Sequence, residues 1–301
     1  MYPAATTRRF LLSNLLVAVA CQISLWAQSV SAAPVELVRQ TVENEIKAND
    51  AIKFMFRERE ENARGTQTKL IVQTQDMAAG MLLAINDKPL TVEERRNELA
   101  RLDELVNNPQ EFRKKQKADK EDTERTNRIM KALPDAFLYE PDGVQAGTKE
   151  IGDSGDDLVR LKFRPNPEYT APTHTEQVLT GMTGYMLIDK AKRRIAKIDG
   201  ILEKEVGFGW GILGHLDKGG RFVVQQGTMG TGVWQMTRMD LDLTGKILFF
   251  KKLVVKSTQT FSDFHEAPPH LTFAQGVELL KKQAQELAEN KPLPTSDHNQ
   301  Q

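Results

Sequence analysis

Residues 207–214, with the sequence GFGWGILG, contain the spacing G-x-G-x-x-G that is typical of a dinucleotide-binding loop. Such a loop must open a helix, because backbone amides at a helix N-terminus hold the pyrophosphate. Here the residues after Gly214 lead through Gly219 and Gly220 into an extended run at residues 221–226, which predicts a strand. We therefore predict that the glycines serve a bent or closely approached strand, with a ligand against the glycine-bearing face as an alternative.

Other residues with catalytic potential lack the spacing that catalysis needs. Asp240 and Asp242 fall on one face of a predicted strand, as a glycosidase carboxylate pair would, but near a turn such residues commonly keep a strand end in water. There is no G-x-S-x-G elbow, and Cys21 is the only cysteine. The histidines form neither H-E-x-x-H nor an i, i+4 pair on a predicted helix: His174, His215, His265, His270 and His298. We predict no catalytic residue, no metal site and no cofactor.

The N-terminal residues predict an export signal. Arg8 and Arg9 precede a mostly apolar run at residues 10–27, and small residues follow that suit cleavage after Ala32. An uncleaved membrane anchor and a lipoprotein cleavage box ending at Cys21 are alternatives.

Removing residues 1–32 leaves no cysteine and 39 basic against 41 acidic residues, a net charge of −2. Stability must then come from a packed core, and nothing in the charge indicates a nucleic-acid partner. We expect a periplasmic or otherwise exported protein with no transmembrane span after cleavage.

The first part of the mature chain mixes helices and strands. Apolar residues recur at helical spacing in residues 35–49. Alternating runs predict three strands, at residues 53–59, 68–75 and 80–85.

Residues 91–133 are dense in both signs of charge and predict a helical hairpin. Thr91 and Glu94 form a capping box, and Asn108 with Pro109 starts the second helix. We expect this charged hairpin to project from the domain as a solvated element packed on one side, and a mobile arm that meets a partner is an alternative.

From residue 136 onward the hydrophobic period changes to two, which predicts strands. Short turns at residues 189–192, 217–220 and 243–246 join several runs, and parallel strands would need longer crossovers, so the sheet should be antiparallel and curved. The strand candidates are residues 136–140, 158–163, 177–189, 194–206, 221–226, 232–243 and 246–260. A capping box at Thr272 and Gln275 then starts a C-terminal helix. The predicted fold class is α+β.

Two predicted strands, residues 184–188 and 246–256, carry apolar side chains on both faces, so one face must cover something other than water. Methionines in this half suit irregular apolar ligands, although methionine is also ordinary core filler. We predict an apolar cavity lined by Met182, Met186, Ile188, Trp210, Ile212, Trp234, Met236, Phe249 and Phe250.

The hairpin at residues 184–200 also carries a resemblance. Its first strand ends in Asp189, turns through residues 190–193 and returns with basic and apolar residues alternating. With the export signal, the N-terminal helix and the long meander, it resembles the outer-membrane lipoprotein carrier and receptor group (LolA/LolB-type) and its lipoprotein-sorting relatives. The resemblance implies an unclosed half-barrel covered by helices, whose hydrophobic cavity takes acyl chains.

We therefore expect one domain at residues 33–290, including the helical insertion at residues 91–133, and a disordered tail at residues 291–301. The expected function is non-catalytic binding of a lipid, acyl chain or lipoprotein in the cell envelope. One alternative is a structural or interaction module that engages an envelope protein through the charged hairpin or a sheet edge. Another is an envelope hydrolase with an unrecognised site.

Overall fold

The computed structural model describes residues 33–48, 52–209, 213–228, 233–247 and 251–289. The predicted export signal and C-terminal tail lie outside these residues. The helices are residues 33–48, α2 (Val92–Asn107), α3 (Pro109–Ala136), α4 (His174–Gln177), the 3-10 helix η1 (Val178–Gly181) and α5 (Phe273–Glu289). The strands are β1 (Phe54–Asn62), β2 (Gly65–Gln73), β3 (Ala78–Ile85), β4 (Lys88–Pro89), β5 (Phe137–Ala146), β6 (Asp157–Pro165), β7 (Met182–Asp189), β8 (Arg194–Leu202), β9 (Val206–Phe208), β10 (Gly214–Leu216), β11 (Arg221–Thr228), β12 (Trp234–Ile247) and β13 (Lys251–Glu266).

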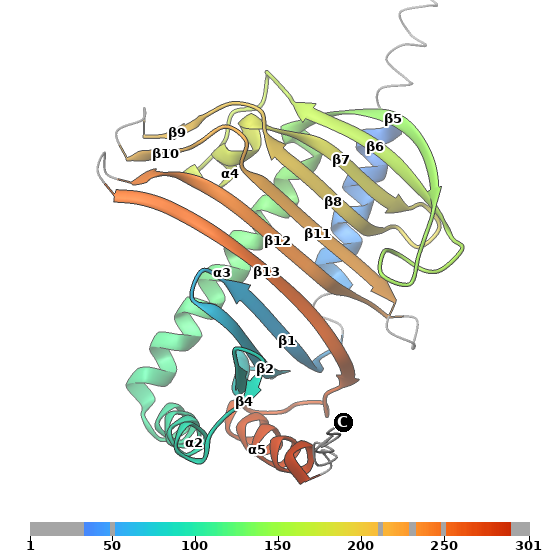
Figure 1. The fold of residues 1–301 in the computed structure, drawn as a ribbon. Helices are drawn as coiled ribbons and strands as arrows, with labels where there is room; N and C mark the ends of the chain where they lie inside the picture. The colour runs from blue at the N-terminus through green and yellow to red at the C-terminus, as the bar shows by residue number, and fades with distance from the viewer. Residues whose placement is uncertain (1–32, 49–51, 210–212, 229–232, 248–250, 290–301) are drawn as a thin grey trace, which may run out of the picture.

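These strands form one curved antiparallel sheet that does not close (Figure 1). Its main path runs β4-β3-β2-β1-β13-β12-β11-β8-β7-β6-β5, and β9 and β10 form a side pair attached to β12. Every pairing between the named strands is antiparallel, because short turns join most neighbours. The predicted fold class, α+β with an open, curved antiparallel sheet and flanking helices, is confirmed.

The two faces of the sheet differ in chemistry. We call the inner face the one that carries Met186, Ile198 and Val224, which lie opposite one another on β7, β8 and β11. Helix 33–48 covers this face with Val38 and Val42, and the end of α3 adds Leu133 to the same buried cluster. Figure 1 shows both helices behind the strands, so the main core lies between them and β5 to β8.

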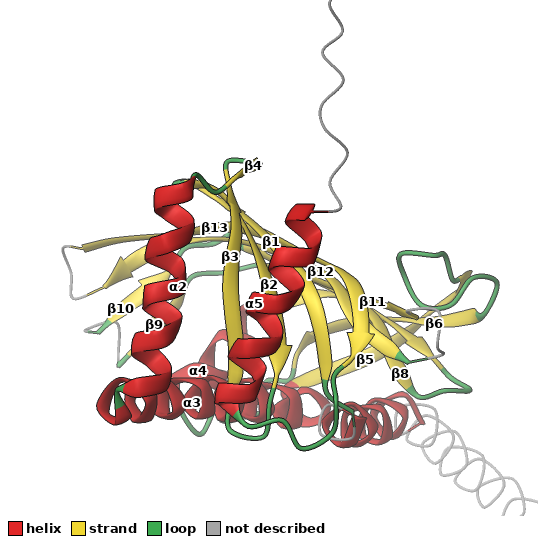
Figure 2. Ribbon diagram, turned by 90° about the horizontal axis from the view of Figure 1, so that it is seen from below, coloured by secondary structure: helices red, strands yellow, loops and turns green. Residues whose placement is uncertain are grey.

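Helices α2 and α5 pack on the outer face at the other end of the sheet. Leu70 of β2 and Met81 of β3 join Leu102 of α2 and Val277 of α5 in a second buried cluster. Figure 2 shows the two helices side by side over β2 and β3, with α3 crossing beneath. The charged hairpin therefore does not project freely, because its apolar stripe is buried against α5 and the sheet.

The same hairpin also covers the free edge of β3. Glu98 on α2 accepts a hydrogen bond from the backbone N–H of Leu82 at 2.7 Å, and Arg101 donates to the carbonyl of Gly80 at 2.8 Å. Arg101 also pairs with Glu98 at 2.7 Å. These side chains satisfy backbone groups that would otherwise offer an edge to another strand.

The predicted helix starts are confirmed. The Thr91 hydroxyl accepts from the Glu94 amide while the Glu94 carboxylate accepts from the Thr91 amide, and Asn108 caps α3, which has Pro109 at its first position. At the C-terminal helix, Gln275 accepts from Thr272 and the Thr272 hydroxyl accepts in return. These starts were predictable because capping involves residues within four positions of each other.

Three predicted boundaries are wrong. Residues 243–246 form no turn: β12 continues through them, because Gly245 lets β10 approach so closely that a Cβ there would lie 2.1 Å from the His215 carbonyl oxygen. The run 177–189 begins as helix and becomes strand only at Met182. The run 194–206 breaks at residues 203–205, so that β9 leaves the line of β8.

One buried ion pair fixes helix 33–48 on the sheet. The Glu45 carboxylate accepts two hydrogen bonds from Arg194, both at 2.9 Å, and a third from the backbone N–H of Ile195 at 2.7 Å. The side chains are only 3% and 14% exposed for Glu45 and Arg194. The contact lies where the β7–β8 register shifts, so Glu45 satisfies an amide at an irregular point of the ladder.

We expect Glu45→Ala to lower the free energy of unfolding by about 3 kcal/mol or more, because it leaves Arg194 uncompensated and the Ile195 amide unpaired. Urea unfolding followed by circular dichroism measures this. The control Glu43→Ala, on the exposed side of the same helix, should change it by less than about 0.5 kcal/mol. Equal effects of the two substitutions would contradict the assigned role of Glu45.

Candidate functional site

Helix α3 crosses the molecule as a strap that is packed at its ends and free in its middle. Near the start of α3, the ring of Phe112 makes an edge-to-face contact with the ring of Phe273 on α5. Near its end, Met130 and Leu133 pack in the main core. Between them, all seven residues 120–126 are exposed. Since seven residues make about two helical turns, every side of the helix faces solvent there. The strap therefore stands clear of the strands that it crosses.

The inner face of the central strands is apolar and only partly covered. Leu241 and Leu243 of β12 lie opposite Ser257 and Val255 of β13, and Phe222 of β11 lies opposite Leu241. All these apolar side chains are half-buried. Figure 1 shows α3 behind β12 and β13, on the side of helix 33–48. We call this surface the strapped face; it comprises Phe222, Met239, Leu241, Leu243, Leu253 and Val255.

An aromatic group continues the strapped face onto β1. Phe56 stacks on Phe264 with ring centroids 5.1 Å apart and meets Phe261 edge-on at 6.0 Å. Glu58, two residues along β1, lies opposite Phe261 and Lys69. Burial raises the pKa of the Glu58 carboxyl, an effect that Lys69 opposes and Glu60 reinforces. A carboxyl group therefore sits at the border between aromatic and polar side chains of the inner face.

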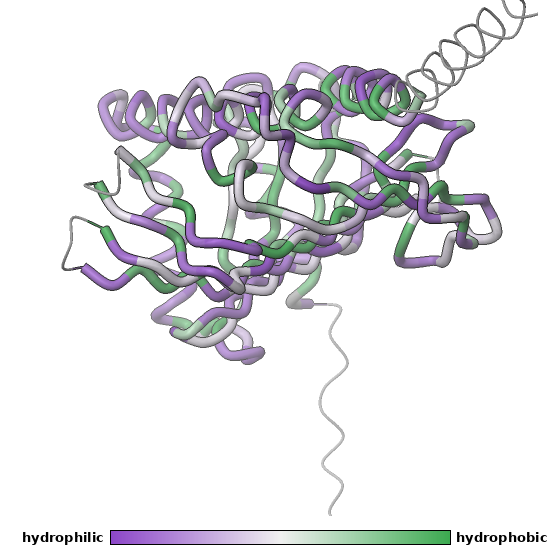
Figure 3. Tube along the Cα trace, turned by 90° about the horizontal axis from the view of Figure 1, so that it is seen from above, coloured by the Kyte–Doolittle hydropathy of each residue, from purple (hydrophilic) through white to green (hydrophobic). Residues whose placement is uncertain are grey.

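The outer face of the same strands is ionic. Arg221 pairs with Asp199 at 2.9 Å, Arg238 with Asp240 at 2.7 Å and Lys256 with Asp242 at 3.4 Å. These pairs lie around a shallow hollow of ≈ 500 Å³. The alternation of apolar and charged residues along the strands is visible in Figure 3. One side of the sheet is thus suited to water and the other to apolar contacts.

The two carboxylates considered for hydrolysis are each held by a cation. Burial raises the pKa of Asp240, but hydrogen bonds from Arg238 and Thr258 outweigh it and hold that pKa below its usual range. Asp242 is the partner of Lys256. A general acid needs a raised pKa, so this arrangement does not resemble an acid and nucleophile pair.

The structure brings together only part of the predicted cavity lining. Met182, Met186 and Ile188 lie in the main core with exposed fractions of 8%, 1% and 0%. Trp234 lies in a separate small cluster with Leu158, Leu187 and Ala196, and Met236 is half-buried on β12. Trp210, Ile212, Phe249 and Phe250 lie outside the described residues. The residues of the strapped face were missed, although their alternation within residues 239–255 was a usable signal.

The predicted hairpin at residues 184–200 is confirmed as β7 and β8, with Asp189 accepting from the backbone N–H of Lys192 in the turn. The segment 207–214 contributes β9 and β10, which pair antiparallel. A strand begins at Gly214, where a dinucleotide loop needs a helix, and the predicted strand at residues 221–226 is confirmed as part of β11.

One group of possible metal ligands was not foreseen. Glu205, His215 and Asp217 each offer a ligand atom, and these atoms lie within 4.8 Å of one another. The only sequence signal was that His215 and Asp217 lie two residues apart. Glu205 joins them because β9 returns antiparallel to β10.

No protein-family model matches this chain, and no curated protein sequence matches it either. Among the described helices, none combines the length and the apolar character needed to span a membrane.

We expect Glu58→Gln to stabilise the protein near neutral pH and to have little effect in acid. A carboxyl whose folded pKa is raised contributes stability below its unfolded pKa and loses it as pH rises through the folded value. The amide removes that loss, so the variant should melt at a higher temperature than the native chain near neutral pH only. The control Glu61→Gln, on the outer face of the same strand, should show no such gain. Equal melting temperatures of the Glu58→Gln variant and the native chain near neutral pH would contradict the burial of Glu58.

Proposed function

We propose that this protein binds an acyl chain or a similar apolar ligand, without catalysis, on the strapped face beneath α3. The observation that carries the proposal is the combination of half-buried apolar residues on β11 to β13 with a helix that stands clear of them. A sheet face that served only as core would be covered by a packed helix, as β5 to β8 are.

The size of the hydrophobic effect makes such binding energetically reasonable. Each methylene removed from water contributes about 0.8 kcal/mol, so a chain that buries about ten methylenes gains about 8 kcal/mol. Loss of ligand freedom and side-chain ordering offset part of this gain. The strapped face offers leucine, valine, methionine and phenylalanine side chains, which suit a flexible chain of no fixed polar pattern.

The place of action that we propose is the cell envelope. The predicted export signal at residues 1–32 supports export, and the hairpin at residues 184–200 with the open sheet supports kinship with the LolA/LolB-type carriers and lipoprotein-sorting proteins. In this proposal the ligand is a lipid or the acyl chain of a lipoprotein, and the strap is the element it passes beneath.

The exposed middle of α3 favours a second candidate function. Residues 120–126, KEDTERT, present charges of both signs around the whole helix. An envelope protein with a complementary charged surface could engage them, which would make this an interaction module. Replacing these residues would then abolish partner binding without affecting uptake of an apolar ligand.

We expect Val255→Asp to abolish uptake of a fluorescent fatty acid, and Val254→Asp to leave it within about twofold of the native chain. Val255 is half-buried and lies opposite Leu243 on the inner face, whereas Val254 is 53% exposed on the outer face. The two are adjacent valines on one strand, so the substitutions differ in the face of the sheet on which the new carboxylate lies. A half-buried, unpaired carboxylate on the path of the ligand would oppose apolar binding.

Native mass spectrometry of the protein with its co-purifying lipid, followed by titration with the fluorescent fatty acid, measures the effect. Circular dichroism of both variants verifies that the fold is retained. If the native chain neither retains nor takes up an acyl species, or if both variants bind equally, the strapped face is not the binding site.

A further inference from the structure

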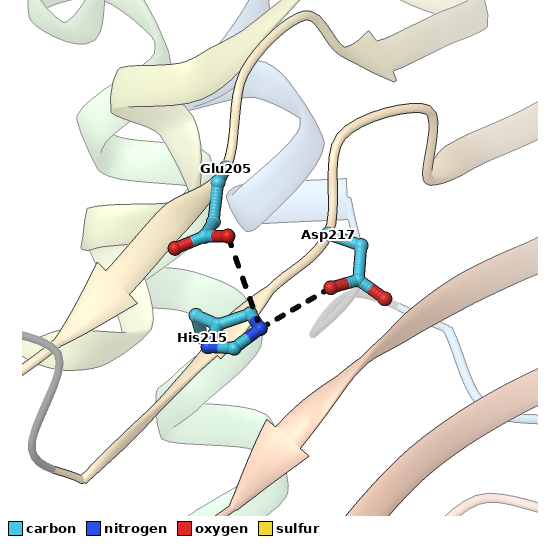
Figure 4. A group of neighbouring side chains, drawn as sticks. All are labelled: Glu205, His215 and Asp217. Carbon is cyan, nitrogen blue, oxygen red and sulfur yellow. Dashed lines mark ion pairs between the residues drawn. The ribbon is translucent and has the colours of Figure 1, made fainter. Parts of the chain in front are cut away.

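Three side chains at the β9–β10 hairpin converge on one point. Glu205 precedes β9, His215 lies in β10 and Asp217 follows it, as Figure 4 shows. The Nε2 atom of His215 lies 3.2 Å from Oδ1 of Asp217 and 3.9 Å from Oε2 of Glu205. Both oxygens thus face the same ring nitrogen from different elements.

These distances suit a shared metal ion better than a shared proton. Ligands about 2.0–2.2 Å from a tetrahedral zinc ion lie roughly 3.3–3.6 Å from each other, which the two separations bracket. A contact of 3.9 Å is too long for a hydrogen bond. A single N–H at Nε2 could therefore serve Asp217 only, and Glu205 would be left without a bond from the imidazole.

The backbone around the site holds two of the ligands in place. His215 pairs with Gly207 of β9 on one side and with Lys246 of β12 on the other. The Thr244 hydroxyl donates to Oδ2 of Asp217 at 2.7 Å, which leaves Oδ1 to face the imidazole. The Asp217 amide donates to the Thr244 carbonyl at 2.8 Å. Such outer hydrogen bonds orient a ligating carboxylate.

We propose that Glu205, His215 and Asp217 bind a divalent transition-metal ion, of which Zn²⁺ fits best, with water in the fourth position. One imidazole and two carboxylates are ligands that zinc accepts in tetrahedral geometry. Calcium needs six to eight oxygen ligands and magnesium six, so three groups that include an imidazole do not suit either ion. The side chain of Glu205 is 63% exposed and that of His215 22% exposed, so water and metal can reach the site.

A bound ion would join the bend at residues 203–205 to β10. Val206, directly after Glu205, lies in the main core, and β10 lies between β9 and β12. Zinc should therefore stabilise this hairpin, which forms the side branch of the sheet. This proposal is independent of the ligand proposed for the strapped face, because no residue is shared.

The test is a competition titration of Zn²⁺ against a chromophoric chelator, on the full-length chain as the cell processes it, after chelator treatment. We expect one zinc per chain and a higher melting temperature with zinc. His215→Ala and Glu205→Gln should each weaken binding by at least about 10–100-fold, the loss that follows even removal of an outer hydrogen-bond partner. Thr244→Val should weaken it by about tenfold, because it frees Asp217.

His174→Ala is the matched control, because this histidine lies near β9, with its ring 6.3 Å from that of Phe208, but outside the cluster. It should bind zinc as the native chain does. Glu205→Gln changes an exposed side chain, so a loss of affinity in that variant cannot be attributed to unfolding. Equal zinc affinity of the native chain, Glu205→Gln and His215→Ala would overturn the proposal, as would equal competition by calcium or magnesium. In that outcome the three groups are an ordinary pair of carboxylates around an imidazole.

Discussion

The whole arrangement depends on one constraint: the sheet curves but does not close, so its strands cannot bury their own inner face. Apolar side chains on an open sheet must be covered by another layer. Helix 33–48 and the end of α3 do this for β5 to β8. At the opposite end of the sheet, α2 and α5 lie on the outer face. Helix α3 therefore has to run from that outer layer to the inner layer formed with helix 33–48. On the central strands, Phe222, Leu243 and Leu253 pack against the border of the main core, and among the described residues Met239, Leu241 and Val255 belong to no buried cluster.

Two carboxylates, one on helix 33–48 and one on α2, bind backbone amides of the sheet. Glu45 accepts from the Ile195 amide where the β7–β8 register shifts, and Glu98 accepts from the Leu82 amide at the sheet edge. Each is paired with an arginine, Arg194 or Arg101, that compensates its charge. Charge-assisted hydrogen bonds are directional, so these contacts specify the position of helix 33–48 and of α2 on the sheet in addition to apolar packing. The ends of α3 are held separately, by Phe112 against Phe273 and by Met130 and Leu133 in the main core.

The two unusual regions of the molecule lie where this packing is incomplete. The strapped face exists because α3 touches the sheet only at its ends, and the Glu205–His215–Asp217 cluster exists because β9 and β10 leave the main path of the sheet. Elsewhere the outer face is neutralised by cross-strand ion pairs such as Arg221 with Asp199. The two candidate binding sites are therefore the strapped face at the centre of the inner face and the Glu205–His215–Asp217 cluster at β9 and β10.

Local features of this protein were determined by the sequence alone. The caps at Thr91, Asn108 and Thr272, the Asp189 turn and the antiparallel meander depend on residues close in the chain, whose hydrogen bonds and periodicity need no tertiary partner. The tertiary structure decided the rest. Only the approach of β10 kept β12 extended through Gly245, and only strand pairing brought Glu205 to His215. The charged residues at 120–126 would have the same sequence pattern on a helix packed along one side as on a helix that is free all round. Such a pattern predicts that part of the helix is exposed, but it does not predict whether another element covers the remaining side.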